Sequence, residues 1–179
     1  MLLPKQTISF RQLINDGLTE NEIISMSASL KLFPTPFKGI YYVPLDEERN
    51  GTFIDRPEIV LYRSVKIFLE DDNFYFSCDT AEEALGIRWH PSSAIHIVNS
   101  KLSRRIKLDK RIIRNRAKHT WRSRKIAKLL SFYGKELVFH RINNISDAKI
   151  HMTQSGSFAT KLQIRKDKKR FHEALQREI

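Results

Sequence analysis

The chain has 179 residues, which suits one domain of ordinary size or a small module joined to a larger body. Hydrophobic residues make up 41% of it, enough for a folded core, which excludes a wholly disordered protein. No apolar run reaches the ~18 residues of a membrane span, and the start up to Lys5 is too short for the core of a signal peptide. Cys78 is the only cysteine, which excludes an internal disulfide and a multi-thiolate zinc site, so we expect a cytoplasmic protein without a membrane partner.

The net charge of +12 is concentrated in one stretch, residues 101–128, here called the basic block. It holds 13 of the 32 lysines and arginines and one acid, Asp109, whereas the rest of the chain has 19 basic and 19 acidic residues. A concentrated positive field favours a polyanion, such as a nucleic acid, or an acidic protein surface as the partner. We expect exposed nucleic-acid contacts from Lys101, Arg104, Arg105, Lys107, Lys110, Arg111, Arg114, Arg116, Arg122, Arg124, Lys125 and Lys128.

Two capping patterns predict two helices near the N-terminus. Ser9 can cap a short helix over residues 10–15. Thr19 and Glu22 form a capping box, in which the hydroxyl accepts from the Glu22 amide while the carboxylate reaches back. This box opens a second helix, predicted over residues 20–31.

A strand follows these helices. Residues 37–43, after a Pro-Thr-Pro break, are typical of a tight turn into a strand. The order helix, helix, β-ribbon over residues 1–44 is typical of a winged helix-turn-helix, although a small packing subdomain needs the same two capped helices. The polar and acidic residues 45–56 indicate a linker or exposed loop.

Residues 57–179 are predicted to form a mixed domain, which makes the fold class α+β. Apolar periodicity predicts helices over residues 57–69 and 120–133. Strands are predicted over residues 73–77 and 136–141.

The remaining elements are weaker patterns. Alternation over residues 94–116 predicts three consecutive strands, a meander with an outer face rich in Arg and Lys. Asp79 and Glu82 form another capping-box pattern, ahead of a helix that stops at Gly86. A basic amphipathic helix is predicted over residues 165–178.

The sequence shows no convergent catalytic set, phosphate-binding glycine loop or metal-ligand spacing, so we expect a non-enzymatic protein without cofactor or metal. The six histidines are scattered and are expected to be surface or satisfied structural residues. A Mg²⁺-dependent nuclease using Asp71, Asp72 and Asp79 is the alternative from another class.

Aromatic residues interleave with the basic block. His119, Trp121 and Tyr133 can stack on unpaired bases, which would suit an RNA-binding module. At helical spacing, Trp121 and Tyr133 are more typical of a core.

Several stretches together resemble the AbiEi-type antitoxin family. Its N-terminal winged helix is similar to Ser9-Phe10-Arg11-Gln12-Leu13, Gly17-Leu18-Thr19, Leu30 and Lys38-Gly39-Ile40-Tyr41. Its motif of a tyrosine, a serine and a small helix ending in Gly-Leu is similar to Phe74-Tyr75-Phe76-Ser77-Cys78-Asp79-Thr80-Ala81-Glu82-Glu83-Ala84-Leu85-Gly86-Ile87. Residues 95–101 and the basic strands resemble its β-meander, so the resemblance covers roughly residues 8–142.

The resemblance implies a transcriptional regulator and antitoxin that binds double-stranded DNA and pairs with a nucleotidyltransferase-like toxin. By position, residues 19–32 would hold the recognition helix. The DNA contacts that this position implies are Asn21, Ser25, Ser29 and Lys31, with Lys38 and Tyr41 on the wing. An RNA-binding or acidic-protein-binding module that uses the basic block is the alternative.

Overall fold

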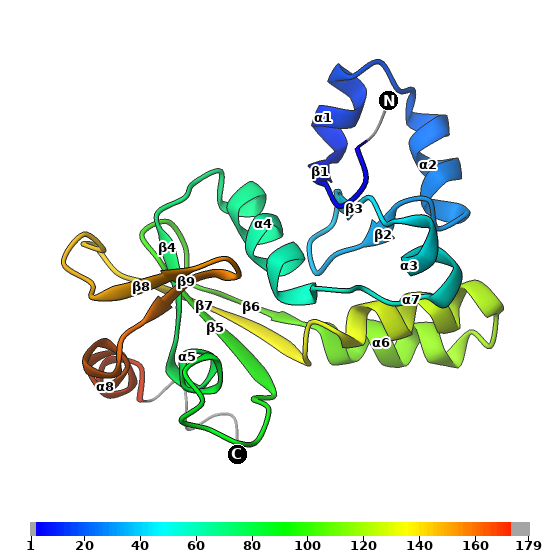
Figure 1. The fold of residues 1–179 in the computed structure, drawn as a ribbon. Helices are drawn as coiled ribbons and strands as arrows, with labels where there is room; N and C mark the ends of the chain where they lie inside the picture. Colours follow the sequence, from blue (N-terminus) through cyan, green and yellow to red (C-terminus); the bar gives the residue numbers. More distant parts are fainter. Residues whose placement is uncertain (1–2, 173–179) are drawn as a thin grey trace. The chain divides into compact units, whose positions relative to one another are not determined.

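The computed structural model describes residues 3–172, and within them it contains eight helices and nine strands, an α+β fold as expected (Figure 1). The chain divides into two compact units. Unit 1 is the chain up to Asp71 together with Lys107–Tyr133, and unit 2 is Asp72–Ile106 together with the chain from Gly134 onward. This division differs from the predicted boundaries at residues 44 and 57, because part of the basic block returns to the N-terminal unit.

Unit 1 contains a three-stranded antiparallel sheet in the order β1-β3-β2. Two short helices connect its first two strands. These elements are β1 (Thr7–Ser9), α1 (Phe10–Asn15), α2 (Glu20–Ala28), β2 (Phe33–Pro34) and β3 (Ile40–Tyr42). The rest of the unit consists of α3 (Asp46–Gly51), α4 (Pro57–Leu69), α6 (Leu108–Ala117) and α7 (Trp121–Ser131).

Both predicted N-terminal helix caps are formed. The Ser9 hydroxyl accepts from the Gln12 amide at 3.2 Å, and the Thr19 hydroxyl accepts from the Glu22 amide at 3.3 Å. Helix α2 ends three residues before its predicted end, since Leu30 takes a left-handed φ of 56°. The side chains between the sheet and the two helices form a core of Ile8, Leu13, Ile23, Leu32 and Val43.

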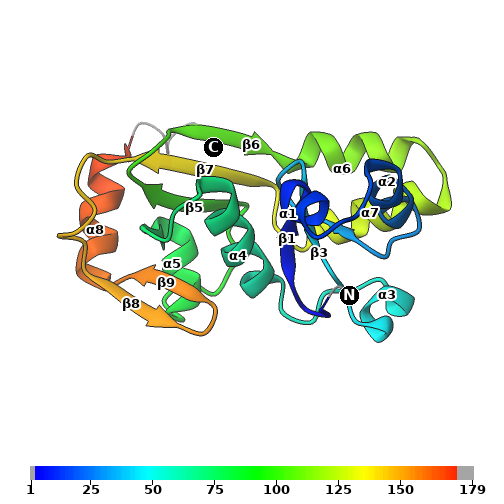
Figure 2. The same cartoon turned by 90° about the horizontal axis from the view of Figure 1, so that it is seen from above.

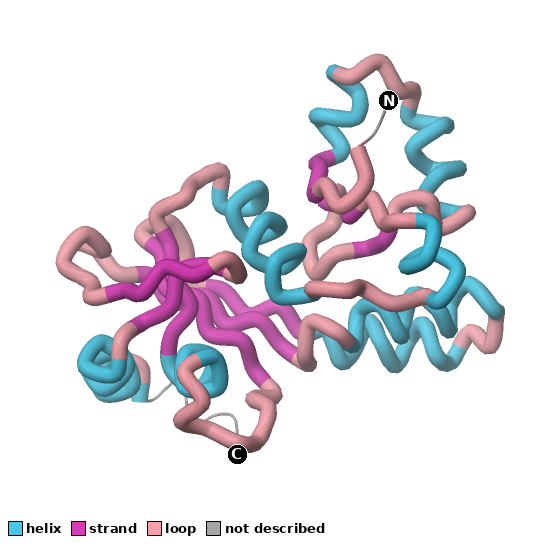
Figure 3. Tube along the Cα trace, viewed as in Figure 1, coloured by secondary structure: helices cyan, strands magenta, loops and turns pink. Residues whose placement is uncertain are grey.

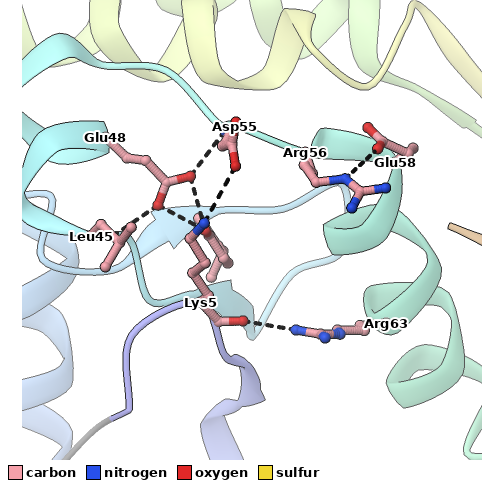
Figure 4. Close-up of polar contacts among 8 residues, drawn as sticks. Lys5, Leu45, Glu48, Asp55, Arg56, Glu58 and Arg63 are labelled. Atoms are coloured by element: carbon pink, nitrogen blue, oxygen red, sulfur yellow. Dashed lines mark hydrogen bonds and ion pairs between the residues drawn. The ribbon is translucent and has the colours of Figure 1, made fainter. Parts of the chain in front are cut away.

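The expected linker over residues 45–56 is wrong, because it contains helix α3 around a buried carboxylate. Glu48 is 1% exposed and accepts from the Tyr42 hydroxyl at 2.8 Å. Its oxygens also accept from the backbone amides of Leu45 at 2.8 Å and Asp55 at 2.9 Å (Figure 4). Burying this acid is tolerable because each oxygen has hydrogen-bond donors.

Unit 2 is built on a six-stranded sheet in the order β6-β7-β5-β4-β9-β8. Neighbouring pairs β5–β7 and β4–β9 are parallel, while β4–β5 and β8–β9 are antiparallel. The strands are β4 (Phe74–Ser77), β5 (Ala94–Asn99), β6 (Arg104–Lys107), β7 (Glu136–Arg141), β8 (Ile150–Thr153) and β9 (Gly156–Ala159). The predicted three-strand meander is therefore wrong in its connectivity, since β7 lies between β5 and β6.

The third predicted strand of that meander is helix α6. Leu108 and Ile112 are both buried, and their i, i+4 spacing places them on one face of a helix. Asp109 lies in the first turn and Arg114 and Arg116 lie in the last, which suits the helix dipole. The alternation of Ile106 and Leu108 with basic residues therefore ends at the boundary between β6 and α6.

Helices α5 (Cys78–Ala84) and α8 (Lys161–Arg170) lie on the same side of the unit 2 sheet and contact each other (Figure 3). Ser77 occupies the N-cap position of α5 and its side chain makes no cap hydrogen bond, so the predicted Asp79–Glu82 capping box is wrong. Both acids pair instead with Lys168 of α8, with Nζ–O distances of 2.8 Å. The tail helix predicted over residues 165–178 begins earlier, at Lys161, and residues 173–178 lie outside the described part of the chain.

Asp167 attaches α8 to the sheet from within the core of unit 2. It is 1% exposed and accepts from the Ser77 hydroxyl at 2.6 Å and the Tyr75 hydroxyl at 3.1 Å. The Gln163 amide donates to its other oxygen at 2.9 Å. Three donors thus satisfy a carboxylate that burial would otherwise make costly.

Candidate nucleic-acid interface

Helices α6 and α7 form a hairpin over residues 108–131 that carries most of the basic block (Figure 2). In α7, the Thr120 hydroxyl accepts from the Ser123 amide at 3.1 Å and caps the helix. Ser123, Ala127 and Leu130 are buried at spacing i, i+4, i+7, so one face packs inward. The exposed basic side chains of the hairpin are Lys110, Arg114, Arg116, Lys118, Arg122, Arg124 and Lys128.

The positive charge of this hairpin is poorly neutralised. Within residues 3–172, no acidic side chain forms an ion pair with Lys110, Arg114, Arg116, Lys118 or Arg124. Over residues 107–133 there are ten lysines and arginines and one acid. Like charges at this density repel one another in the free protein, and an anionic partner relieves that repulsion.

Two arginines that were expected to be exposed have structural partners instead. Arg111 is half-buried and donates from its guanidinium to the Pro36 carbonyl at 2.5 Å, so it holds the β2–β3 turn. Burial, with the charge of Arg114 beside it, lowers the pKa of Arg111. Arg105 pairs with Glu136 at 3.0 Å. The predicted full exposure of these two arginines is wrong, because sequence spacing does not show which positive side chain finds a carbonyl or a carboxylate.

The basic block is divided between the two units. Lys101, Arg104 and Arg105 belong to unit 2, at the start of β6 and in the turn before it. Lys107 is the exposed N-cap residue of α6 and belongs to unit 1. Only the part from Lys107 onward is therefore in the same compact unit as α1 and α2.

The helical spacing of Trp121 and Tyr133 favoured a core position for both side chains. Tyr133 is buried as expected, with 1% of its surface exposed, whereas Trp121 is 60% exposed. Lys125 Nζ lies 3.9 Å from the Trp121 ring centroid, which is a cation–π contact. An exposed aromatic ring beside a cation is the arrangement that stacks on a base and contacts its phosphate.

The residues that the family resemblance implied as DNA contacts lie on α2, in the turns after it and in β3. Asn21 and Ser25 are exposed on α2, and Lys31 and Lys38 are exposed beyond it. Two more have internal roles. The Ser29 hydroxyl donates to the Ser25 carbonyl at 2.9 Å, and Tyr41 is half-buried against the core of unit 1.

A pair of buried histidines in unit 2 is a feature that the sequence did not reveal. His96 Nδ1 and His140 Nε2 lie 3.0 Å apart, and the His140 ring stacks on Phe171 at 4.0 Å between centroids. Burial, together with the charges of His96 and Arg105, lowers the pKa of His140 to about 3. The pair arises from the β5–β7 register, which single-sequence reasoning does not supply.

Metal-ligating clusters and membrane-spanning helices are both absent from the described part of the chain. Within residues 3–172, no three His, Cys, Asp or Glu side chains are grouped to hold a metal ion. Asp79, considered for a nuclease, pairs with Arg88 and Lys168. In the same range, no helix is long and apolar enough to cross a membrane.

Comparison of the chain with protein-family models, curated proteins and solved structures gives no match.

Proposed function

We propose that this chain is a non-enzymatic, DNA-binding transcriptional regulator of the AbiEi antitoxin type, whose unit 1 binds duplex DNA. The observation that carries the proposal is the grouping within unit 1. The α6–α7 hairpin belongs to the same compact unit as helices α1 and α2 and the sheet β1-β3-β2. The helix pair α1–α2, which the family resemblance implies is a helix-turn-helix element, and a set of unneutralised cations in one compact unit could contact one duplex together.

The two parts have different tasks in this proposal. Asn21, Ser25 and Lys31 would face base edges or flanking phosphates from α2 and its C-terminal turn. The hairpin residues would contact phosphates, which supplies affinity and a steep salt dependence without sequence choice. The nucleotidyltransferase-like toxin partner follows from the family resemblance.

The test is fluorescence anisotropy with the duplex from upstream of the gene, a scrambled duplex and an RNA of equal length, at two salt concentrations. We expect preference for the upstream duplex, retained at the higher salt. The triple variant K110E/R114E/R116E should weaken duplex binding at least tenfold. It should also reduce the slope of log affinity against log salt by about 0.9 for each phosphate that the variant no longer neutralises.

The matched control is K161E/R165E/K169E on α8 of unit 2, which changes the net charge equally at exposed positions. It should leave the affinity within about threefold of the unaltered protein, because the interactions with phosphate are local. If both triple variants weaken binding equally, the hairpin is not the interface and net charge alone governs the interaction.

The exposed ring of Trp121 supports a second candidate, an RNA-binding module. A single strand stacked on this indole would quench its fluorescence and bind less tightly to a Trp121→Ala variant. Tighter binding to RNA than to the upstream duplex in the same experiment, with weakening in Trp121→Ala, would favour this function over the regulator.

A further inference from the structure

Unit 2 contains an open hollow of about 530 Å³ between the end of β7, the following loop and α8. Its floor is formed by Ile142 and Gln163, which are 6% and 7% exposed. Gln163 is held in place, because its amide donates to Asp167 and its oxygen accepts from the Lys149 amide at 3.3 Å. The site therefore has a fixed base rather than a surface of mobile side chains.

Three cations surround this hollow. Arg141 ends β7, and Lys166 and Arg170 lie one turn apart on α8, on the same side as Gln163. All three residues are exposed at the surface. Within the described residues, none of them forms an ion pair.

The acid that lines the hollow does not neutralise these cations. The Asp147 carboxylate accepts from the side-chain amide of Asn144 at 2.9 Å, and both residues belong to the loop that lines the hollow. The Asn144 oxygen in turn accepts from the Ser146 amide at 3.0 Å, which fixes the loop. The lining thus has three positive charges against one negative charge, and its loop is already ordered by its own hydrogen bonds.

The lining chemistry indicates the class of ligand. Two guanidinium groups and one ammonium suit a phosphate, whose oxygens arginine binds in a bidentate manner. The volume lies within the range of small-molecule sites and leaves room beyond the phosphate. Side-chain amides such as that of Asn143 offer both a donor and an acceptor, which a nucleobase edge can match.

We propose that this hollow of unit 2 is a binding site for a nucleoside phosphate, with Arg141, Lys166 and Arg170 contacting the phosphate and the loop over residues 142–149 contacting the nucleoside. The site is separate from the hairpin of unit 1 and does not depend on the function proposed for it. The nucleotide is either free or part of a single strand, since both present the same phosphate and base.

The test is a titration of the ¹⁵N-labelled full chain with adenosine 5′-monophosphate, followed by amide chemical shifts. We expect saturable shifts confined to residues 141–149 and 161–170. Adenosine without its phosphate should bind at least tenfold more weakly, because it lacks the group that the cations hold. If oligoadenylate shifts the same amides at lower concentration, the ligand is part of a single strand. If oligoadenylate does not shift them at lower concentration, the ligand is the free nucleotide.

The variant R141E/K166E should weaken binding of adenosine 5′-monophosphate at least tenfold. Its matched control, K161E/K169E, changes the charge equally with exposed residues of the same helix that do not line the hollow, and should stay within about twofold. The unbound amide spectrum of each variant verifies its fold. Absence of saturable shifts, shifts only outside these residues, or equal weakening in both variants would overturn the proposal. K110E/R114E/R116E should bind the nucleotide normally, which separates this result from the duplex experiment.

Discussion

Glu48 and Asp167 are buried acids that each unit surrounds with donors instead of cations. Glu48 accepts from one hydroxyl and two backbone amides, and the side chain of Lys5 nearby pairs with Asp55 instead (Figure 4). Charge-assisted hydrogen bonds of this kind are stronger than those between neutral groups. Burial raises the pKa of the Tyr42 phenol, and the hydrogen bond to Glu48 and the charge of Glu48 raise it further.

Glu48→Gln should lower the free energy of unfolding by about 1–3 kcal/mol, measured by urea denaturation. The amide nitrogen that replaces one carboxylate oxygen is a donor, so it faces at least one backbone N–H that then lacks an acceptor. Glu47→Gln, at an exposed position of the same helix, should change stability by less than about 0.5 kcal/mol. Equal effects of the two substitutions would mean that the Glu48 hydrogen bonds do not stabilise the fold.

Among the secondary-structure elements, the two N-terminal helix caps were predictable from local sequence. Ser9 and Thr19 are used as their sequence patterns predicted, because a capping box acts within four residues and needs no tertiary partner. The pattern Asp79-x-x-Glu82 shows the limit of this logic. Its acids point toward Lys168, 89 residues from Asp79 in the chain, and this long-range ion pair competes successfully with the local cap.

Thr120→Ala should cost about 1 kcal/mol of stability, because it removes the hydroxyl that caps α7. Thr160→Ala is the matched comparison at the N-cap of α8. The Thr160 hydroxyl makes no cap bond, and it is buried without a hydrogen-bond partner among residues 3–172. Its removal should cost less than about 0.5 kcal/mol by chemical denaturation. A larger loss of stability for Thr160→Ala than for Thr120→Ala would contradict the capping argument.

At the scale of the whole molecule, the path of the chain between the two units is the main feature. The chain leaves unit 2 after Ile106 and returns to it at Gly134. Between these points it supplies the α6–α7 hairpin and Tyr133 of unit 1, and Leu129, Leu130 and Tyr133 are fully or almost fully buried. Each unit is therefore discontinuous in sequence, and a boundary at one point of the chain cannot describe this division.

The two units should respond differently to acid, because the buried His96–His140 pair belongs to unit 2. The pKa of His140 falls from an ordinary 6.5 to about 3 on folding, with burial as the largest cause. Below about pH 6.5 the unfolded chain binds a proton that the folded unit does not, so stability falls as pH falls toward about 3. The slope for this one group approaches about 1.4 kcal/mol per pH unit.

Hydrogen exchange followed by mass spectrometry at pH 7 and pH 5, corrected for intrinsic rates, measures this effect by unit. Peptides from residues 72–106 and 134–172 should lose protection more than peptides from residues 3–71. His140→Gln removes the titrating group and should flatten the pH dependence of unit 2 while lowering its stability at pH 7. Equal loss of protection in both units, or an unchanged slope in His140→Gln, would argue against the histidine pair as the cause.

Several elements follow from local chemistry and could be predicted without the rest of the fold. The helix over Pro57–Leu69 was predicted to the residue, and the strand over Glu136–Arg141 likewise, because an amphipathic period and a short β-prone run with clear ends are local signals. The charge concentration of the basic block is also a property of the amino-acid sequence.

Which side chains meet depends instead on the three-dimensional arrangement of each unit. That arrangement turned the segment after Leu108 into a helix, gave Arg111 a carbonyl partner, left Trp121 exposed and brought Arg141 near Lys166 and Arg170. Each of these depends on strand register or on packing between segments far apart in the chain. Sequence periodicity shows which face of a helix or strand is apolar. The segment that packs against that face is decided by contacts between residues far apart in the chain, which a short stretch of sequence does not include.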